Sequence, residues 1–188
     1  MFNVIEDFYS PSDFGLVIAH FVNIHFSPTY QPKVQNYGGN RLNAYPCHES
    51  EFFKKDDNPY SVYNIFKNTF EKKTGIKILD LKTFLRKIKL DELKKSPVYK
   101  NNRPHKDKDA DVAGLLYFNS GCLKDGTYIY NSEYDYEPSI IIGSNPNRCT
   151  YYDTSLWHSP GTHQEIDERW VQPFFIIYKE ETLNLIDK

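Results

Sequence analysis

The chain has 188 residues and a formal net charge of −2, which suits a single domain. It contains 15 Tyr and 13 Phe, so strand formers dominate its apolar set, and collagen-like, disordered and coiled-coil classes are excluded. No apolar run approaches the ~18 residues of a transmembrane helix. The first nine residues lack the basic start of a signal peptide, and three widely spaced Cys make neither a disulfide framework nor a zinc knuckle. We therefore expect a reduced, cytoplasmic protein with no membrane partner.

The first 75 residues are predicted to hold one strand and two supporting helices. Residues 2–5 favour a strand, and Ser10-Pro11-Ser12-Asp13 is typical of a helix start. Apolar residues at helical spacing follow this start: Phe14, Val17, Ile18, Phe21 and Val22. Residues 27–50 read as irregular. A second helix is expected over residues 51–73, interrupted at Asn58-Pro59 and ended by Gly75.

Beyond Gly75 the pattern changes to short strands. We expect them at residues 83–90, 113–119, 127–131, 139–143, 148–152 and 170–178. The alternation is clear in the first of these, where one face carries Phe84, Arg86, Ile88 and Leu90. Turn signals separate the strands at Asn119-Ser120-Gly121, Asp125-Gly126, Asn145-Pro146 and Pro160-Gly161. Such spacing predicts a sandwich or barrel. The expected fold is mostly β with N-terminal helices (α+β): residues 1–75 support a core of residues 76–188 in one compact domain.

The charge is unevenly distributed along the chain. Residues 67–108 hold 14 Lys/Arg and 5 Asp/Glu, so the rest of the chain is strongly acidic. A solvated basic face explains this segment, and a patch that attracts an anionic substrate or nucleic acid is the alternative. The chain as a whole is slightly acidic rather than basic, so a nucleic-acid partner is not favoured.

One group of residues in the second half of the chain indicates a metal site. His105 and Asp107 lie two positions apart, which places both side chains on one face of an extended segment, where they can share a metal ion. About 0.8 such pairs are expected by chance, and a second pair is present at His163-Gln164-Glu165. The downstream residues distinguish the two pairs. His158 and then Arg169, at the start of the last predicted strand, come after Asp107, whereas no His comes after His163.

This order resembles that of the iron(II)- and 2-oxoglutarate-dependent dioxygenases. The resemblance covers residues 83–178 and rests on the segments PHKDKDADVAGLLYFN, NRCTYYDTSLWHS and ERWVQPFFI; the opening VIEDFYSP is also similar. Together these segments are similar to the prolyl-hydroxylase-type branch, or to one of its small relatives.

The resemblance implies a double-stranded β-helix core, also called a jelly-roll or cupin-like core. It also implies a hydroxylase that uses Fe(II), 2-oxoglutarate and O2 and releases succinate and CO2. By motif match, His105, Asp107 and His158 fall on the metal ligands, and Arg169 falls on the residue that binds the distal carboxylate of 2-oxoglutarate. Tyr117 matches a tyrosine that supports the same carboxylate.

The chemistry of these residue types agrees with the implied roles. Two imidazoles and one carboxylate on one face of a metal are typical of iron(II) oxygenases and leave positions open for other ligands. A guanidinium matches a carboxylate bidentately, which suits Arg169. We expect Arg169 on the strand that pairs with the strand leading to His158.

Several alternatives stay open on the sequence alone. His163 competes with His158, and Asp109 or Asp111 replaces Asp107 if the loop is bulged. Tyr117 is an ordinary core residue in the alternative interpretation. Trp170 and Val171 stand where a small hydroxyl residue is often found, so the second contact to the carboxylate comes from Tyr117, Gln172 or elsewhere. Arg148 is expected to pair internally with acids, and residues 130–137 are a candidate substrate loop over the site mouth.

Three functions from different classes are compatible with these residues. The first is an oxygenase that hydroxylates a peptide side chain, an amino acid or a small metabolite. The second is an oxygenase acting on nucleic acid, guided by residues 67–108. The third is a jelly-roll module that keeps the fold and binds a metal or ligand without turnover.

Overall fold

The computed structural model describes residues 1–28, 46–95, 104–119, 123–161 and 165–180. In chain order, the helices and strands are β1 (Phe2–Ile5), α1 (Pro11–Asn23), β2 (Ser27–Pro28), β3 (His48–Glu49), α2 (Val62–Thr74), β4 (Asp80–Thr83), β5 (Arg86–Lys89), α3 (Leu90–Lys95), β6 (Val112–Tyr117), β7 (Thr127–Tyr130), β8 (Ile140–Ile142), β9 (Cys149–Asp153), β10 (Trp157–Pro160) and β11 (Glu168–Ile177). Four predicted features lie at least partly outside the described residues: residues 29–45 of the irregular segment, residues 96–103 of the basic segment, the turn at residues 119–121, and the pair beginning at His163.

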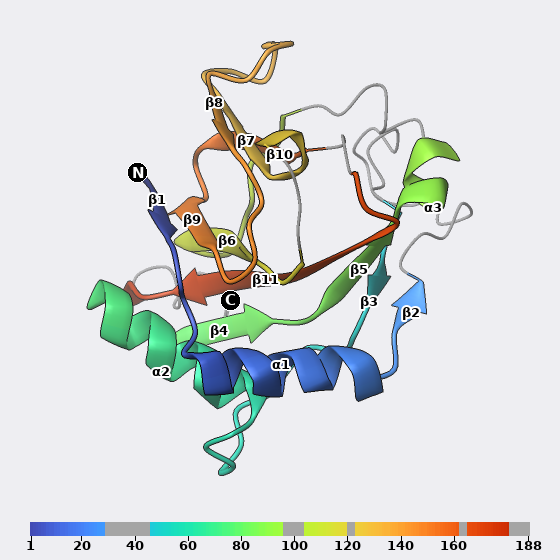
Figure 1. Ribbon diagram of the computed structural model, residues 1–188. Coiled ribbons are helices and arrows are strands. Elements are labelled where there is room, and N and C mark those ends of the chain that lie inside the picture. The colour runs from blue at the N-terminus through green and yellow to red at the C-terminus, as the bar shows by residue number, and fades with distance from the viewer. Residues whose placement is uncertain (29–45, 96–103, 120–122, 162–164, 181–188) are drawn as a thin grey trace.

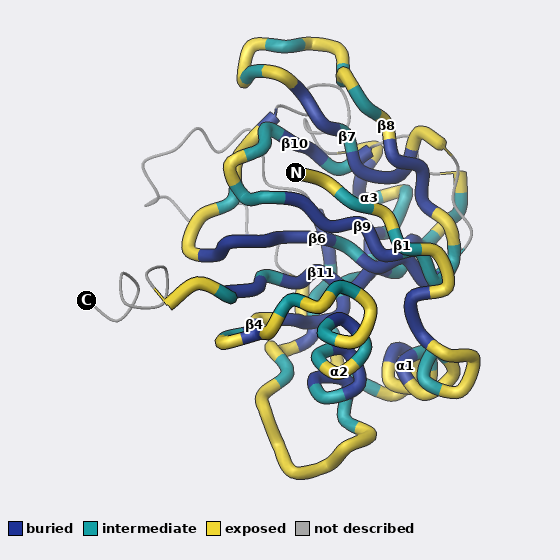
Figure 2. Tube along the Cα trace, turned by 90° about the vertical axis from the view of Figure 1, so that its left-hand side faces the viewer, coloured by how far each residue is buried: buried dark blue, intermediate teal, exposed yellow. Residues whose placement is uncertain are grey.

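The strands form two antiparallel sheets. The larger sheet has the order β1-β9-β6-β11-β5-β3-β2, with β4 also paired to β11, and the smaller has the order β10-β7-β8. Figures 1 and 2 show α1 and α2 against one side of the larger sheet and the smaller sheet on its other side. This is the mostly β, antiparallel architecture predicted from the strand spacing.

The N-terminal region contributes strands to the larger sheet as well as helices. Phe2 in β1 pairs with Tyr152 in β9, and Glu49 in β3 pairs with Arg86 in β5. Both parts of the predicted division at residue 75 therefore build the same sheet.

The long strand β11 is central in this sheet, and Pro173 explains a break beside it. β11 pairs with β6 on one edge and with both β5 and β4 on the other. Proline has no N–H to donate to a ladder, and the neighbouring strand is interrupted at Phe84 and Leu85, opposite Pro173. The Pro173 carbonyl still accepts from the Thr83 hydroxyl at 2.9 Å. The single strand predicted at residues 83–90 is therefore wrong: β4 ends at Thr83, β5 spans Arg86–Lys89, and Leu90 begins α3.

The face of the larger sheet that meets the helices holds an aromatic core. Phe66 and Phe174 pack at a ring-centroid distance of 4.7 Å, and Phe21 stacks on Trp170 at 5.1 Å. Figure 2 shows the long buried stretches along β6, β9 and β11 that face this layer and the interior between the sheets. The helix predicted after Ser10 is present as α1, with Ser10 as its N-cap and Pro11 at its first turn.

The second predicted helix is shorter than expected. Residues 51–60 are irregular, and α2 begins after Ser61, whose side chain accepts from the backbone N–H of Asn64. The Asn58 and Asp56 side chains cap local turns in the preceding segment, which competes with helix formation.

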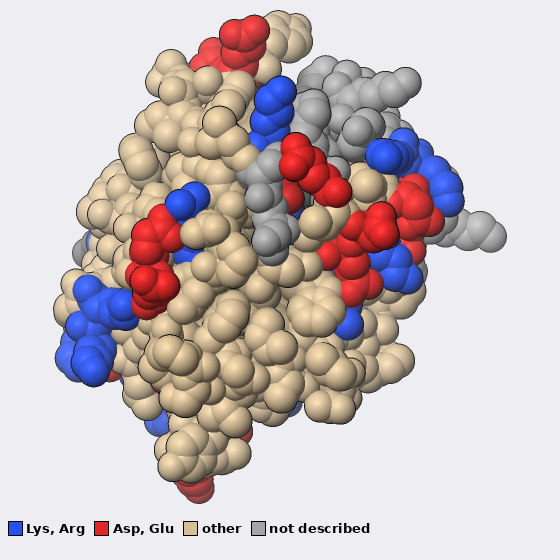
Figure 3. All heavy atoms as spheres, viewed as in Figure 1, with Lys and Arg blue, Asp and Glu red and all other residues tan. Residues whose placement is uncertain are grey.

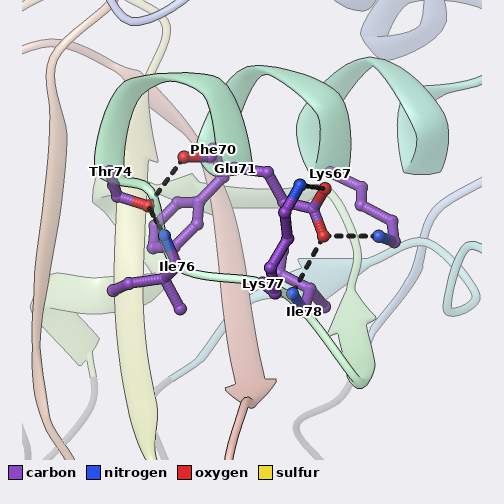
Figure 4. Close-up of polar contacts among 7 residues, drawn as sticks. All are labelled: Lys67, Phe70, Glu71, Thr74, Ile76, Lys77 and Ile78. Atoms are coloured by element: carbon purple, nitrogen blue, oxygen red, sulfur yellow. Dashed lines mark hydrogen bonds and ion pairs between the residues drawn. The ribbon is translucent and has the colours of Figure 1, made fainter.

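The end of α2 is fixed by a compact set of polar contacts (Figure 4). Gly75 has φ of 75°, a left-handed conformation that favours glycine, and ends the helix as predicted. The Glu71 carboxylate accepts from Lys67 Nζ at 2.6 Å and from the backbone N–H of Ile78 at 2.9 Å. Burial opposes ionisation of Glu71, but these hydrogen bonds prevail and hold its pKa below the usual value. Glu71 therefore joins α2 to the segment that enters β4.

The basic segment is interleaved with acids where the structure describes it. Ion pairs join Lys67 to Glu71, Lys87 to Glu168, and Lys95 to Asp91. On the face shown in Figure 3, lysines and arginines lie beside acidic residues near the left and right margins, and the surface between them is largely uncharged. This arrangement favours the solvated-face interpretation. Among the described residues, no helix has the length and apolar character needed to cross a bilayer.

Candidate metal centre and cosubstrate pocket

The three predicted metal ligands meet between the two sheets. His105 and His158 form an isolated antiparallel bridge, with reciprocal backbone hydrogen bonds of 2.9 Å. Their rings lie 4.4 Å apart between centroids, and His158 Nε2 lies 3.3 Å from Asp107 Oδ2. One ligand atom from each of the three residues lies within 4.8 Å of the others. The backbone bridge therefore brings together side chains separated by about 50 residues.

The hydrogen bonding of His158 fits a metal ligand. Its Nδ1 lies 3.1 Å from the carbonyl oxygen of Leu156. A carbonyl only accepts, so Nδ1 carries the proton, and the lone pair of the neutral ring is on Nε2, which faces Asp107. Two neighbouring ligands at about 2.1 Å from an octahedral ion lie about 3 Å apart, close to the separation seen here. The donor set therefore fits iron(II).

The two alternative carboxylates lie outside this cluster. Asp109 is exposed and has φ of 61°. Asp111 accepts from the backbone N–H groups of Tyr178 and Lys179, both at 2.9 Å, and thus binds the chain just after β11. Of the three neighbouring aspartates, Asp107 alone joins the two histidines.

A pocket of about 250 Å³ opens beside the three side chains. Its walls combine apolar and aromatic groups with charged and polar side chains that converge near the metal ligands. It is lined by Arg86, His105, Asp107, Ala113, Gly114, Leu115, Thr127, Tyr152, His158, Ser159, Pro160, Pro173 and Phe175.

Tyr117 and Arg169 lie deeper between the sheets. Both side chains are almost fully buried. The Tyr117 hydroxyl lies 2.7 Å from Thr127 Oγ1, an atom of a pocket-lining residue. Burial raises the pKa of Tyr117 to about 12, although the Thr127 hydrogen bond and the charge of Arg169 oppose the rise. Tyr117 therefore keeps its proton and is a hydrogen-bond donor at neutral pH.

The Arg169 guanidinium is held by main-chain oxygens. Its Nη1 donates to the Asp125 carbonyl and to the Gly161 carbonyl at 3.3 Å. Its Nε is buried with no hydrogen-bond partner among the described residues. A buried donor without a partner is costly, and an incoming carboxylate would satisfy it. The expected strand pairing was wrong, however. β11 pairs with β4, β5 and β6, whereas β9, the strand that leads to His158, pairs with β1 and β6, and His158 itself lies on β10 in the other sheet.

Two other sequence-based interpretations are decided by hydrogen bonds. Arg148 donates from Nε to Glu6 Oε1 at 2.8 Å, which confirms the internal ion pair. Gln172 lies on the helix-facing side of β11, where it accepts from the Tyr9 hydroxyl and donates to Thr83 Oγ1. Gln172 therefore points away from the pocket, and its suggested contact with a carboxylate is wrong.

Sequence reasoning missed two side chains that line the pocket, Arg86 and Tyr152. The Tyr152 ring lies 4.4 Å from that of His158, and burial together with the charge of Asp107 raises its pKa well above the usual value. Arg86 had a detectable signal, because it is a charged residue on the apolar face of an alternating strand. Residues 130–137 contribute nothing to the pocket lining, and their role as a substrate loop stays a prediction.

Comparison with known proteins defines the fold. No protein-family model and no curated protein matches the sequence. Among solved structures, a 2OG-Fe(II) oxygenase-family oxidoreductase from Burkholderia pseudomallei matches with a TM-score of 0.61 and 7% identity, over 95% of this chain and 86% of that chain. A prolyl hydroxylase from Trichoplax adhaerens, in complex with a hypoxia inducible factor peptide fragment, matches with a TM-score of 0.58 and 12% identity, over 98% and 86%. HygX from Streptomyces hygroscopicus, with nickel and 2-oxoglutarate bound, matches with a TM-score of 0.55 and 9% identity, over 92% and 81%.

The predicted fold is therefore confirmed. The chain has the double-stranded β-helix fold of the 2-oxoglutarate and iron(II) oxygenases, and the His-x-Asp and distal His motif converges within it.

Proposed function

We propose that the protein is an iron(II)- and 2-oxoglutarate-dependent oxygenase that hydroxylates a peptide side chain, an amino acid or a small metabolite. One observation carries the proposal: His105, Asp107 and His158 converge at a pocket between the sheets of this fold. The bound HygX ligands and the peptide held by the Trichoplax enzyme support the cosubstrate and the substrate classes.

The chain's own residues would each have a defined task. His105, Asp107 and His158 would hold the iron, and the Leu156 carbonyl would keep His158 in the tautomer that coordinates through Nε2. Arg169 would bind the distal carboxylate of 2-oxoglutarate, with Tyr117 donating a hydrogen bond from its protonated hydroxyl. Apolar groups such as Leu115 and Phe175 would exclude water from the pocket. Iron(II), with 2-oxoglutarate and O2, supplies the oxidising chemistry that forms succinate and CO2 and hydroxylates a C–H bond.

The test is conversion of 2-oxoglutarate to succinate by the purified protein with iron(II) under air. We expect slow turnover without a primary substrate, lost on chelation of the metal and in His158→Ala. Metal and 2-oxoglutarate binding without any succinate would instead identify a binding module.

The nucleic-acid alternative has little support, because ion pairs neutralise several basic residues of the segment 67–108. Single-stranded oligonucleotides that stimulate succinate formation in a salt-dependent manner would favour it.

A further inference from the structure

We propose that Arg86 forms a second carboxylate-binding subsite in the metal pocket and binds a carboxylate group of the primary substrate. This inference rests on the proposed function, in which Arg169 binds the cosubstrate.

The strand register directs Arg86 into the space between the sheets. Arg86 pairs with Val171 of β11, and Val171 pairs with Tyr117 of β6. Cross-strand partners share a face, so Arg86 projects on the same side of the sheet as Tyr117. It lines the pocket together with His105 and Asp107.

Arg86 places a guanidinium in the wall of the pocket. Among the described residues that line the pocket, no other Lys or Arg is present. Arg169 pairs with Ile88, which lies two positions along β5 from Arg86. The backbone positions of the two arginines are therefore offset by about 7 Å along the strand direction. One distal carboxylate bound at Arg169 therefore leaves Arg86 to a different anionic group.

The Arg86 guanidinium is held in a fixed orientation. Glu49, its partner across the β3–β5 pair, contacts it through one oxygen: Oε1 lies 2.7 Å from Nε and 2.5 Å from Nη2. The guanidinium carbon also lies 5.2 Å from the centroid of the Phe84 ring. A pre-oriented guanidinium loses less freedom when it binds a planar carboxylate.

The pocket size restricts the substrate further. A volume of about 250 Å³ is below the roughly 300–1,000 Å³ of sites for drug-sized ligands. Because the metal and 2-oxoglutarate would share this volume, the space left beside Arg86 favours a small carboxylic acid, such as an amino acid, or a single acidic side chain of a peptide.

Arg148 provides a matched control outside the pocket. Its Nε and Nη2 contact Glu6 Oε1 at 2.8 and 2.5 Å, and its side chain is 23% exposed, against 27% for Arg86. The two arginines thus share contact geometry and exposure, although Glu6 is 52% exposed against 22% for Glu49, and of the two only Arg86 lines the pocket.

The experiment uses acetate as the carboxylate probe and acetamide as its neutral counterpart. The Nε–H resonances of Arg86 and Arg148, assigned with Arg86→Gln and Arg148→Gln, are followed by NMR in protein loaded with diamagnetic zinc and saturating 2-oxoglutarate. We expect a saturable, millimolar shift at Arg86 with acetate, none with acetamide, and at least tenfold weaker response at Arg148.

Three results would overturn the inference. Equal responses at both arginines would show nonspecific binding, and no response at Arg86 in either the presence or the absence of 2-oxoglutarate would show that its ion pair is purely structural. An acetate response that disappears when 2-oxoglutarate saturates the protein would assign Arg86 to the cosubstrate. If the protein binds neither zinc nor 2-oxoglutarate, the proposed function fails, and titration of the unloaded protein still tests Arg86 as a carboxylate site.

A second variant pair tests the competition with Glu49. Glu49→Gln removes the resident carboxylate and should tighten acetate binding at Arg86 about two- to fivefold, the range that a partly exposed ion pair represents. Glu6→Gln should leave it unchanged. Weaker binding in Glu49→Gln would contradict the arrangement.

Discussion

Asp107 and Asp109 are neighbours in the sequence, but their surroundings differ. Asp107 lies 3.3 Å from His158 Nε2, whereas Asp109 is exposed and outside the cluster. We expect Asp107→Ala to weaken manganese binding by more than ~100-fold, because even residues that only orient metal ligands contribute about 10–100-fold. Calorimetric titration measures the effect. Asp109→Asn is the control, since asparagine tolerates its positive φ, and comparable losses in both variants would remove Asp107 from the site.

Arg169 makes a separable contribution to cosubstrate binding. Loss of one partner of a desolvated charge pair costs about 2–5 kcal/mol. Arg169→Ala should therefore weaken 2-oxoglutarate binding roughly 30-fold to a few thousand-fold, and Arg169→Lys should fall between because it offers one point charge. The titration uses manganese-loaded protein, with manganese affinity as the control. Equal 2-oxoglutarate affinity in the wild type and in Arg169→Ala would exclude this role.

At the scale of elements, Glu71 links α2 to the following segment. Its carboxylate holds Lys67 and the Ile78 N–H, and its pKa is lowered on folding. A lowered pKa in the folded state means that ionised Glu71 stabilises the fold above its usual pKa and loses this effect as pH falls through the lowered value.

Glu71→Gln should therefore reduce the free energy of unfolding by about 1.5–3 kcal/mol at pH 7. The difference should shrink as the pH falls below the usual pKa of a glutamate and through the lowered pKa of folded Glu71, where the carboxyl becomes protonated. Urea unfolding at several pH values measures it, with the exposed Glu51→Gln as control. A difference independent of pH would show that the charge of Glu71 is irrelevant.

Gly126 allows two strand ends to approach each other near Arg169. A Cβ at Gly126 would lie 1.7 Å from the Ile142 carbonyl oxygen, and Gly126 accepts from the Gly161 N–H at 2.7 Å. We expect Gly126→Ala to lower the free energy of unfolding by about 1–3 kcal/mol or more. It should also weaken 2-oxoglutarate binding, because the Asp125 and Gly161 carbonyls hold Arg169. Thermal and urea unfolding measure the first effect.

Gly15→Ala is the matched control for that substitution. Gly15 lies in α1 with no atom within 4 Å of an added Cβ, so alanine should stabilise the helix by about 0.5–1 kcal/mol. Equal destabilisation by both substitutions would contradict the close approach at Gly126.

At the scale of the whole molecule, ligand loading should stabilise the fold. Metal and cosubstrate would bridge β10, β11 and the segment before β6, so their binding favours the native state. At 100 times the dissociation constant, a ligand contributes about 2.7 kcal/mol, which corresponds to a rise in Tm of roughly 5–10 °C for a domain of this size. Thermal unfolding with manganese and 2-oxoglutarate measures it. Chelation should reverse the rise, and its persistence in Asp107→Ala would place binding elsewhere.

The sequence predicted the elements whose pattern is local. The strands near residues 113–119, 127–131 and 170–178 are short apolar or aromatic runs bounded by turn residues, and α1 carries its own cap and apolar spacing. The motif at His105, Asp107 and His158 was recognisable because its order, rather than any single residue, is informative.

The remaining features depend on contacts between distant segments. β10 consists of Trp-His-Ser-Pro, which has no alternating apolar pattern, and becomes a strand by pairing with β7. The break between β4 and β5 reflects Pro173, about 90 positions away. Arg86 and Tyr152 become pocket residues only when the two sheets face each other, which local periodicity does not reveal.

The pairing of β1 with β9 also affects how the chain folds. Phe2 and Tyr152 are about 150 positions apart, so β1 forms one of the most non-local contacts in the molecule. Closing such a long loop delays folding. At roughly 5–20 residues per second during synthesis, β1 waits about 8–30 s for its partner strand. During that interval its backbone hydrogen-bonding groups are exposed, and a chaperone that shields extended segments would increase the yield of folded protein.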